Sequence, residues 1–183
     1  MNQIVSESAE AAPDEPGSTI ETSAPYFFAP STIKFAVMSL CTFGLYEAYW
    51  FYNNWALIKA RTNSDVMPFW RAVFSPLWAY SCFRHVKVSA GESRTRALPP
   101  IEWLAAAYFL LQALWRLPNP YWLVSLLSFV PIIPVNVAAL EVNRAKGVED
   151  VQSARFSPWN WMGVLFGGGL LVFELIAAIT QSI

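Results

Sequence analysis

Side chains that bind metals or act as nucleophiles are scarce in this sequence. His85 is the single histidine, and the two cysteines, Cys41 and Cys82, each lie inside an apolar stretch. A zinc, haem or iron–sulfur site needs more thiols or several histidines. The sequence therefore predicts no metal site and no cofactor, and both cysteines are expected to be free thiols that behave as small apolar side chains.

Charged residues are scarce as well. They make up 14% of the 183 residues, against about a quarter in soluble domains, while hydrophobic residues make up 55%. The basic residues flank apolar stretches and form no cluster interleaved with exposed aromatic residues, so no nucleic-acid groove is predicted. This composition predicts that the lipid bilayer is the main partner of the chain.

The first 24 residues contain no base and few apolar side chains. Their charged residues are all acidic: Glu7, Glu10, Asp14, Glu15 and Glu21. A cleavable signal peptide begins with basic residues and continues with an apolar run, and neither is present here. We therefore expect residues 1–24 to be a disordered acidic tail and residues 25–183 to be a transmembrane helical domain.

Five apolar stretches follow this tail, and each approaches the ~20 residues that a helix needs to cross a membrane. They cover residues 33–55, 69–88, 101–116, 121–140 and 159–179. Most tryptophans lie near the ends of these stretches, as in the aromatic belts of membrane proteins. The sequence thus predicts an all-α membrane protein, a bundle of five transmembrane helices, with four helices as the alternative.

Local signals predict where several helices begin and end. Ser31 or Thr32 can cap the first helix, and Pro68 suits the first turn of the second. The prolines at 118 and 120 should end the helix near Leu117. Pro131 and Pro134 should kink the fourth helix.

The distribution of bases decides between five and four crossings. With five crossings, eight bases share the side of the N-terminus: Lys34, Arg84, Lys87, Arg94, Arg96, Arg144, Lys146 and Arg155. The other side then holds Lys59, Arg61, Arg71 and Arg116. In the alternative with four crossings, residues 101–140 cross once. Five bases then lie on one side of the membrane and six on the other, and Arg116 lies inside the membrane. The positive-inside rule therefore predicts five crossings and a cytoplasmic N-terminus.

Two acidic residues lie within apolar stretches, Glu47 in the first and Glu174 in the fifth. A carboxylate in the membrane core costs about 2.5–3.5 kcal/mol on insertion scales, so it is a candidate functional group. The polar candidates for partners of Glu47 are Gln112, Asn136 and the tyrosines at 46, 49 and 52. Glu47 is therefore either a relay point for protons or cations, or a protonated carboxyl that binds helices together. For Glu174 the second interpretation is favoured.

The fifth stretch contains a G-x-x-x-G pattern at Gly163 and Gly167. Small residues at this spacing allow two helix backbones to approach closely. The pattern predicts a helix-packing face, used either inside the protein or in a homo-oligomer. A phosphate-binding glycine loop is excluded, because no strand precedes the glycines and no G-K-[ST] follows them.

The sequence from Thr42 to Trp55 contains the motif F-G-x-Y-x-x-Y-W-F-Y-x-N-W, and Pro68-Phe69-Trp70-Arg71-Ala72 follows it. In these motifs the chain resembles a family of uncharacterised bacterial inner-membrane proteins. The likeness continues through Leu117-Pro118 and Pro131 to Asn143. It implies a multi-pass location in the bacterial cytoplasmic membrane, and it implies no activity and no functional residues.

Three classes of function are compatible with these features. A membrane scaffold, or an assembly or stress-response partner of another membrane protein, fits the small size, the acidic tail and the glycine face. A small transporter or ion-coupled permease fits Glu47, the prolines and a weak similarity between the first and last pairs of stretches. An enzyme is disfavoured, because no catalytic group of residues is visible. Convergence of Glu47, Gln112 and Asn136 on one cavity would favour transport.

Overall fold

The computed structural model describes residues 25–94, 98–118, 121–148 and 157–181, and the predicted tail at 1–24 lies outside these residues. The described part of the chain is all-α, as predicted, with seven α-helices, two 3-10 helices and no strand. The elements are α1 (Thr32–Cys41), α2 (Leu45–Thr62), α3 (Pro68–Val73), α4 (Ser75–Glu92), α5 (Ile101–Ala113), the 3-10 helices η1 (Leu114–Arg116) and η2 (Tyr121–Ile132), α6 (Ile133–Ala145) and α8 (Pro158–Gln181).

The first apolar stretch is two helices, not the single helix expected over residues 33–55. Phe43 and Gly44 have φ angles of 51° and 85°, and the Gly44 N–H donates to the Ser39 carbonyl at 2.9 Å. This left-handed ending stops α1 after ten residues, about 15 Å of helix. Thr42 links the two helices, because its hydroxyl donates to the Met38 carbonyl and accepts from the Tyr46 N–H. The expected first crossing is therefore a helical hairpin.

The second apolar stretch is also divided. Pro68 lies in the first turn of α3, as predicted, but α3 ends after six residues at Phe74, whose φ and ψ are −98° and 37°. Pro76 then occupies the first turn of α4, where the backbone N–H that proline lacks would have no partner within the helix. A continuous helix over residues 69–88 is therefore wrong.

Other helix ends follow the local signals. The Ser31 hydroxyl accepts from the Lys34 N–H and caps α1, and the chain becomes extended at Leu117 before Pro118. The effect of Pro131 and Pro134 is a change of winding rather than a bend in one α-helix. The chain winds as a 3-10 helix up to Ile132 and as α6 from Ile133.

Two helical segments are long and apolar enough to cross a membrane: Tyr121–Ala145, which joins η2 to α6, and Asn160–Thr180 within α8. In the described residues the other helices do not meet that criterion. The five crossings expected from the sequence are therefore reduced to two candidates.

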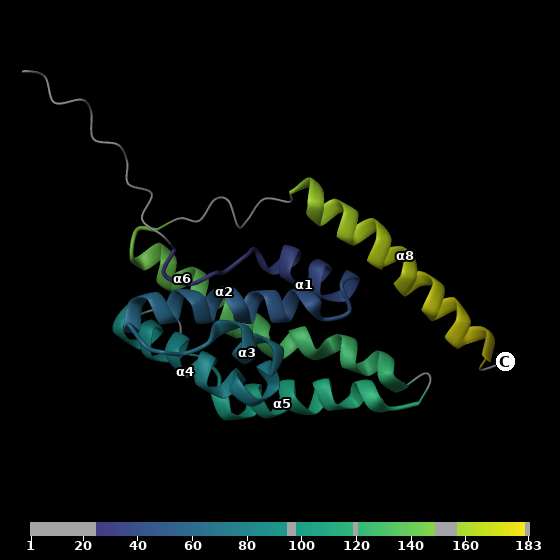
Figure 1. Ribbon diagram of the computed structural model, residues 1–183, viewed down its shortest axis with the longest axis horizontal. Helices are drawn as coiled ribbons and strands as arrows, with labels where there is room; N and C mark the ends of the chain where they lie inside the picture. Colours follow the sequence, from purple (N-terminus) through teal and green to yellow (C-terminus); the bar gives the residue numbers. More distant parts are fainter. Residues whose placement is uncertain (1–24, 95–97, 119–120, 149–156, 182–183) are drawn as a thin grey trace, which may run out of the picture.

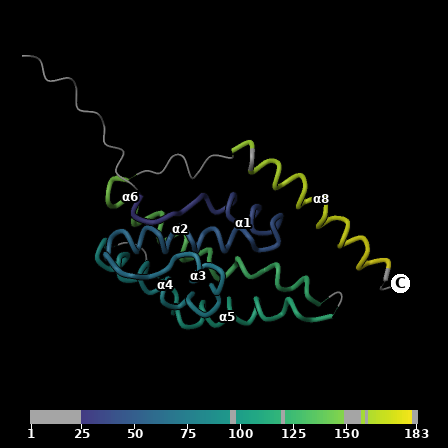
Figure 2. Tube along the Cα trace, in the orientation of Figure 1, coloured from purple at the N-terminus to yellow at the C-terminus, as the bar shows by residue number. Residues whose placement is uncertain are grey.

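Helices α2, α4, α5 and α6 lie together in the body of the molecule (Figure 1). They surround a core that is rich in aromatic side chains. Its largest fully buried side chains include Trp50, Trp55, Phe51 and Tyr108. By contrast, α8 runs along the outside of the molecule and packs mainly on α1, as the tube in Figure 2 also shows.

The two ends of the helical body differ in character. At one end, which we call the tip end, the α1–α2 turn meets the start of η2, because Phe43 stacks on Trp122 with ring centroids 6.4 Å apart. At the other, which we call the basic end, Arg61 and Lys146 both lie over the Tyr26 ring, at 3.6 and 4.2 Å from its centroid. Figure 1 shows the two ends on opposite sides of the body.

This contact at Tyr26 corrects the predicted topology. Five crossings would put Arg61 and Lys146 on opposite sides of the membrane, yet the two side chains share one aromatic ring. The reason is the hairpin of α1 and α2, which returns the chain to the end from which it started (Figure 1).

Candidate functional site

Glu47 lies in the first turn of α2, directly after the turn at Gly44, and its side chain is 1% exposed. Ser128 of η2 donates its hydroxyl proton to Oε1 at 2.7 Å and also lies 3.0 Å from Oε2. Gln112 of α5 donates from Nε2 to Oε2 at 3.0 Å. The structure therefore brings together Glu47 and Gln112, two residues that the sequence singled out.

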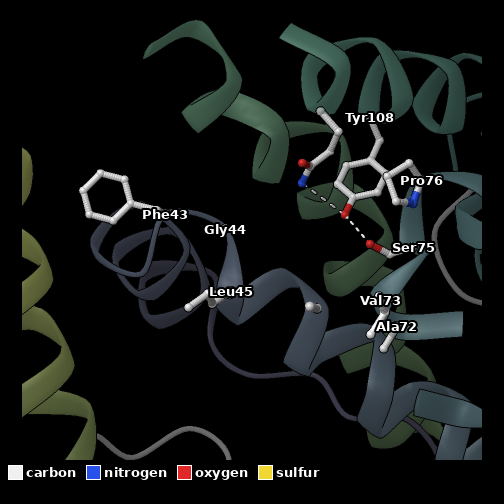
Figure 3. A pocket seen from close by; sticks show the side chains of 10 residues that line it. Phe43, Gly44, Leu45, Ala72, Val73, Ser75, Pro76 and Tyr108 are labelled. Carbon is white, nitrogen blue, oxygen red and sulfur yellow. Dashed lines mark hydrogen bonds between the residues drawn. The ribbon is translucent and has the colours of Figure 1, made fainter. Parts of the chain in front are cut away.

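The hydrogen bonds continue from Gln112 towards α4. Gln112 Nε2 lies 3.4 Å from the Tyr108 hydroxyl, which bonds to the Ser75 hydroxyl at 2.9 Å (Figure 3). We call these five residues the Glu47 network: Glu47, Ser128, Gln112, Tyr108 and Ser75. Because they come from α2, η2, α5 and α4, the network ties four elements together.

A pocket of about 210 Å³ lies beside the network. Ser75, Tyr108 and Gln112 form its polar part, and Figure 3 shows the Tyr108 hydroxyl bonded to the Ser75 hydroxyl. Its other lining residues are Phe43, Gly44, Leu45, Ala48, Ala72, Val73 and Pro76. Most of the lining residues are therefore apolar, and the polar side of the pocket is connected through Gln112 to the Glu47 carboxylate.

Asn136, the third residue expected at this site, has a different role. Its Nδ2 donates to the Pro30 carbonyl at 2.7 Å, and its Oδ1 accepts from Trp50 Nε1 at 2.9 Å. Asn136 thus lies near the network, since Trp50 follows Glu47 by one helical turn, but these bonds are to other groups. It does not converge with Glu47 and Gln112.

Two further asparagines bond to the same non-helical segment, residues 26–30. Asn143 accepts from the Phe27 N–H at 2.9 Å and donates to the Phe27 carbonyl at 2.7 Å, as a neighbouring strand would. Asn54 donates to the Phe28 carbonyl at 3.0 Å. The asparagines of α2 and α6 therefore have a structural role, because they satisfy backbone groups in a largely buried segment that belongs to no helix.

Glu174 and the two glycines lie on α8. The Glu174 side chain is half-buried, and the bonds to the Glu47 carboxylate come from other elements, so the two acids do not form one site. A Cβ at Gly167 would overlap the Cys41 carbonyl, and one at Gly163 would lie 3.7 Å from the Met38 side chain. The glycine face thus packs inside the protein, against α1.

Sequence reasoning missed three members of the network: Ser75, Tyr108 and Ser128. It expected tyrosines of α2 near Glu47, but Tyr49 and Tyr52 are exposed. The available signal was a serine within the apolar run from Tyr121 to Ile132, because a hydroxyl in such surroundings needs a partner. Tyr108 carried no comparable signal, since it sits among other aromatic and apolar residues of α5.

Cys41 and Cys82 are free thiols, as predicted. Within the residues that the structure describes, no three of the His, Cys, Asp and Glu side chains gather into a group. Comparisons with protein-family models, with curated proteins and with solved structures find no match to this chain.

Proposed function

We propose that this chain is an integral membrane protein with a non-catalytic role, a scaffold that holds or helps to assemble other membrane components. The observation that carries this proposal is the closed state of the Glu47 network. Its carboxylate is 1% exposed and its bonds are made by side chains of the protein itself. An acid in this state joins helices and offers no open position to a transported ion.

Membrane integration is supported by the surface of α8. The helix has 24 residues, about 36 Å of length, which exceeds the ~30 Å of a bilayer core. Leu165, Phe166 and Phe173 are 73%, 76% and 68% exposed. A continuous apolar surface of this size is unfavourable in water and is normal against lipid chains. The segment Tyr121–Ala145 is the second candidate for a crossing.

The orientation follows from the charges. The connection between the two candidate crossings begins at the basic end, next to Arg144 and Lys146, and the segment at Tyr26 lies there too. By the positive-inside rule this end is cytoplasmic. We retain from the resemblance of Thr42–Trp55 the proposal of a bacterial cytoplasmic membrane location, and a second membrane protein or a second copy of the chain as partner.

One observation favours a second candidate function, a small transporter or ion-coupled permease. Hydrogen bonds lead from the pocket-lining Ser75 and Tyr108 through Gln112 to Glu47. These bonds place a pocket with two hydroxyl groups next to a buried acid, an arrangement that a proton- or cation-coupled transporter needs. Under this function Glu47 must change its charge during the cycle.

Substitution of Glu47 by glutamine separates the two functions. Glutamine keeps the size and hydrogen-bonding capacity of the side chain but cannot release a proton. We expect Glu47→Gln to complement a deletion strain as well as the wild-type chain does, with Glu174→Gln as the matched control. Loss of complementation by a folded, membrane-located Glu47→Gln protein, while the control still complements, would overturn the scaffold proposal in favour of transport.

A further inference from the structure

Four bases from four helices gather at the basic end. The ring of His85 on α4 packs edge-on against Trp55 of α2, with centroids 5.9 Å apart. The charges that act on His85 are those of Arg61, Arg71 and Arg84. Burial and these three positive charges lower the pKa of His85. Lys146 joins the group from α6, because it shares the Tyr26 ring with Arg61.

Aromatic rings hold three of these cations, Arg61, Arg71 and Lys146, in place. Arg61 lies over Tyr26, and Arg71 lies over both Trp55 and Trp78, at 4.2 and 4.4 Å from the ring centroids. Stacking of this kind occupies the flat face of a guanidinium. The N–H groups lie in the plane of the guanidinium, so those of Arg61 that do not bond to Tyr26 can donate to an oxyanion at the edge.

Like charges that gather in this way repel each other, and an anion that binds among them removes the repulsion. Arg61, Arg84 and Lys146 are exposed, so an anion reaches them without any rearrangement of the core. A phosphate group suits the site, because it accepts bidentate hydrogen bonds from arginine.

The position of the cluster identifies the source of the phosphate. Lys146 is the first residue after the candidate crossing Tyr121–Ala145, so under the proposed membrane location it lies where lipid headgroups begin. Tyr26 and Trp78, which are partly exposed, are also of the types that favour this layer. We propose that the basic cluster, Arg61, Arg71, Arg84 and Lys146, binds the phosphate of an anionic phospholipid headgroup. This inference rests on the proposed membrane integration.

The test uses the full chain in dodecyl maltoside, mixed with phosphatidylglycerol or with phosphatidylcholine of the same acyl chains. A ligand that binds the folded state raises its unfolding temperature. We expect phosphatidylglycerol to raise the midpoint by about 5 °C more than phosphatidylcholine does. The double variant Arg61→Gln/Lys146→Gln should lose most of this difference. The matched control Arg116→Gln, an exposed base beyond α5, should keep it.

If the double variant does not fold, Arg84→Gln is the second variant, and it should lose part of the difference. Equal shifts with both lipids would overturn the proposal, as would loss of the difference in Arg116→Gln. An equal shift with inorganic phosphate alone would show a free-anion site instead. If removal of residues 1–24 destabilises the wild type but not the double variant, and the lipids act equally, the cluster binds the acidic tail and the proposal is wrong.

These outcomes are separate from those of the proposed function. A wild-type chain that is extracted from membranes by alkaline carbonate contradicts membrane integration itself. A chain that resists extraction but does not distinguish the two lipids contradicts only the headgroup site.

Discussion

Glu47 shows how a single acidic residue is accommodated in an apolar environment. A buried carboxyl without hydrogen bonds would be strongly destabilising, and here Ser128 and Gln112 supply the donors from two other elements. Ser128 and Gln112 need the carboxylate in turn, because the Ser128 hydroxyl is buried and the Gln112 amide is half-buried, and each requires a hydrogen-bond partner. The acid therefore stabilises the packing of α2 on α5 and η2.

We expect Glu47→Leu to destabilise the protein and Glu47→Gln to be nearly neutral. Leucine removes the acceptor and leaves the Ser128 hydroxyl without its partner, which costs about 1–3 kcal/mol for an unsatisfied buried group. Thermal unfolding in detergent measures the loss. Glu174→Leu is the control and should cost little, because α8 presents this position outside the network. Equal losses for the two leucine variants would refute the structural role of Glu47.

At the scale of the element, α8 depends on one narrow contact. Most of its large side chains are exposed, and its glycines allow close approach to α1, where Gly167 lies directly against the Cys41 carbonyl. Gly169, two residues later, has nothing within 4 Å of the position of a Cβ. The contact is therefore set by the rotation of the helix, and only one side of the glycine run takes part.

Alanine at Gly167 should separate α8 from α1, whereas alanine at Gly169 should not. The added methyl group at 167 overlaps backbone, which cannot move aside as a flexible side chain does. In a chain that carries Cys41→Ala and Cys82→Ala, a short bis-maleimide that links cysteines introduced at Met38 and Gly163 reports the contact, since a Cβ at 163 lies 3.7 Å from the far end of the Met38 side chain. We expect efficient cross-linking with Gly169→Ala and poor cross-linking with Gly167→Ala. Efficient cross-linking in both variants would show that the contact tolerates a side chain.

At the scale of the whole molecule, an apolar turn and the basic cluster lie at opposite ends of the helical body. The α1–α2 turn meets η2 at the tip end, while Arg61 and Lys146 meet at the basic end. A bundle of five crossings would alternate its connections between the two sides of a membrane. The observed arrangement instead returns α1 and α2 to one side as a hairpin.

Labelling of single cysteines tests this topology in a chain that carries Cys41→Ala and Cys82→Ala. We expect Asn63→Cys and Arg94→Cys to react with an impermeant reagent from the same, cytoplasmic side, because α2 and α4 both end near the basic end (Figure 1). Arg116→Cys, beyond α5, should react from the opposite side or be protected by lipid. Reaction of positions 63 and 94 from opposite sides would restore the five-crossing topology.

Local sequence was sufficient for features that depend on a residue and its near neighbours. Helix content, the Ser31 cap, the Pro68 start and the break after Leu117 follow from backbone restrictions and capping chemistry within a few residues. Apolar composition likewise identified α8 and the segment Tyr121–Ala145 as candidates for crossings. The turn at Phe43-Gly44 had a local signal too, the glycine, but the apolar residues on both sides of it favoured one long helix.

Only the tertiary structure decided which distant groups meet. Glu47 meets Ser128 across 81 positions of sequence, and Phe27 meets Asn143 across 116. Hydropathy averages such polar residues into an apolar stretch and contains no information about their partners. Base counting failed for the same reason, because it assumes that each apolar stretch crosses once, and the hairpin of α1 and α2 reverses the chain instead. Reversal depends on two residues with positive φ and on the packing of the helices that they join, and packing is a property of the folded chain as a whole.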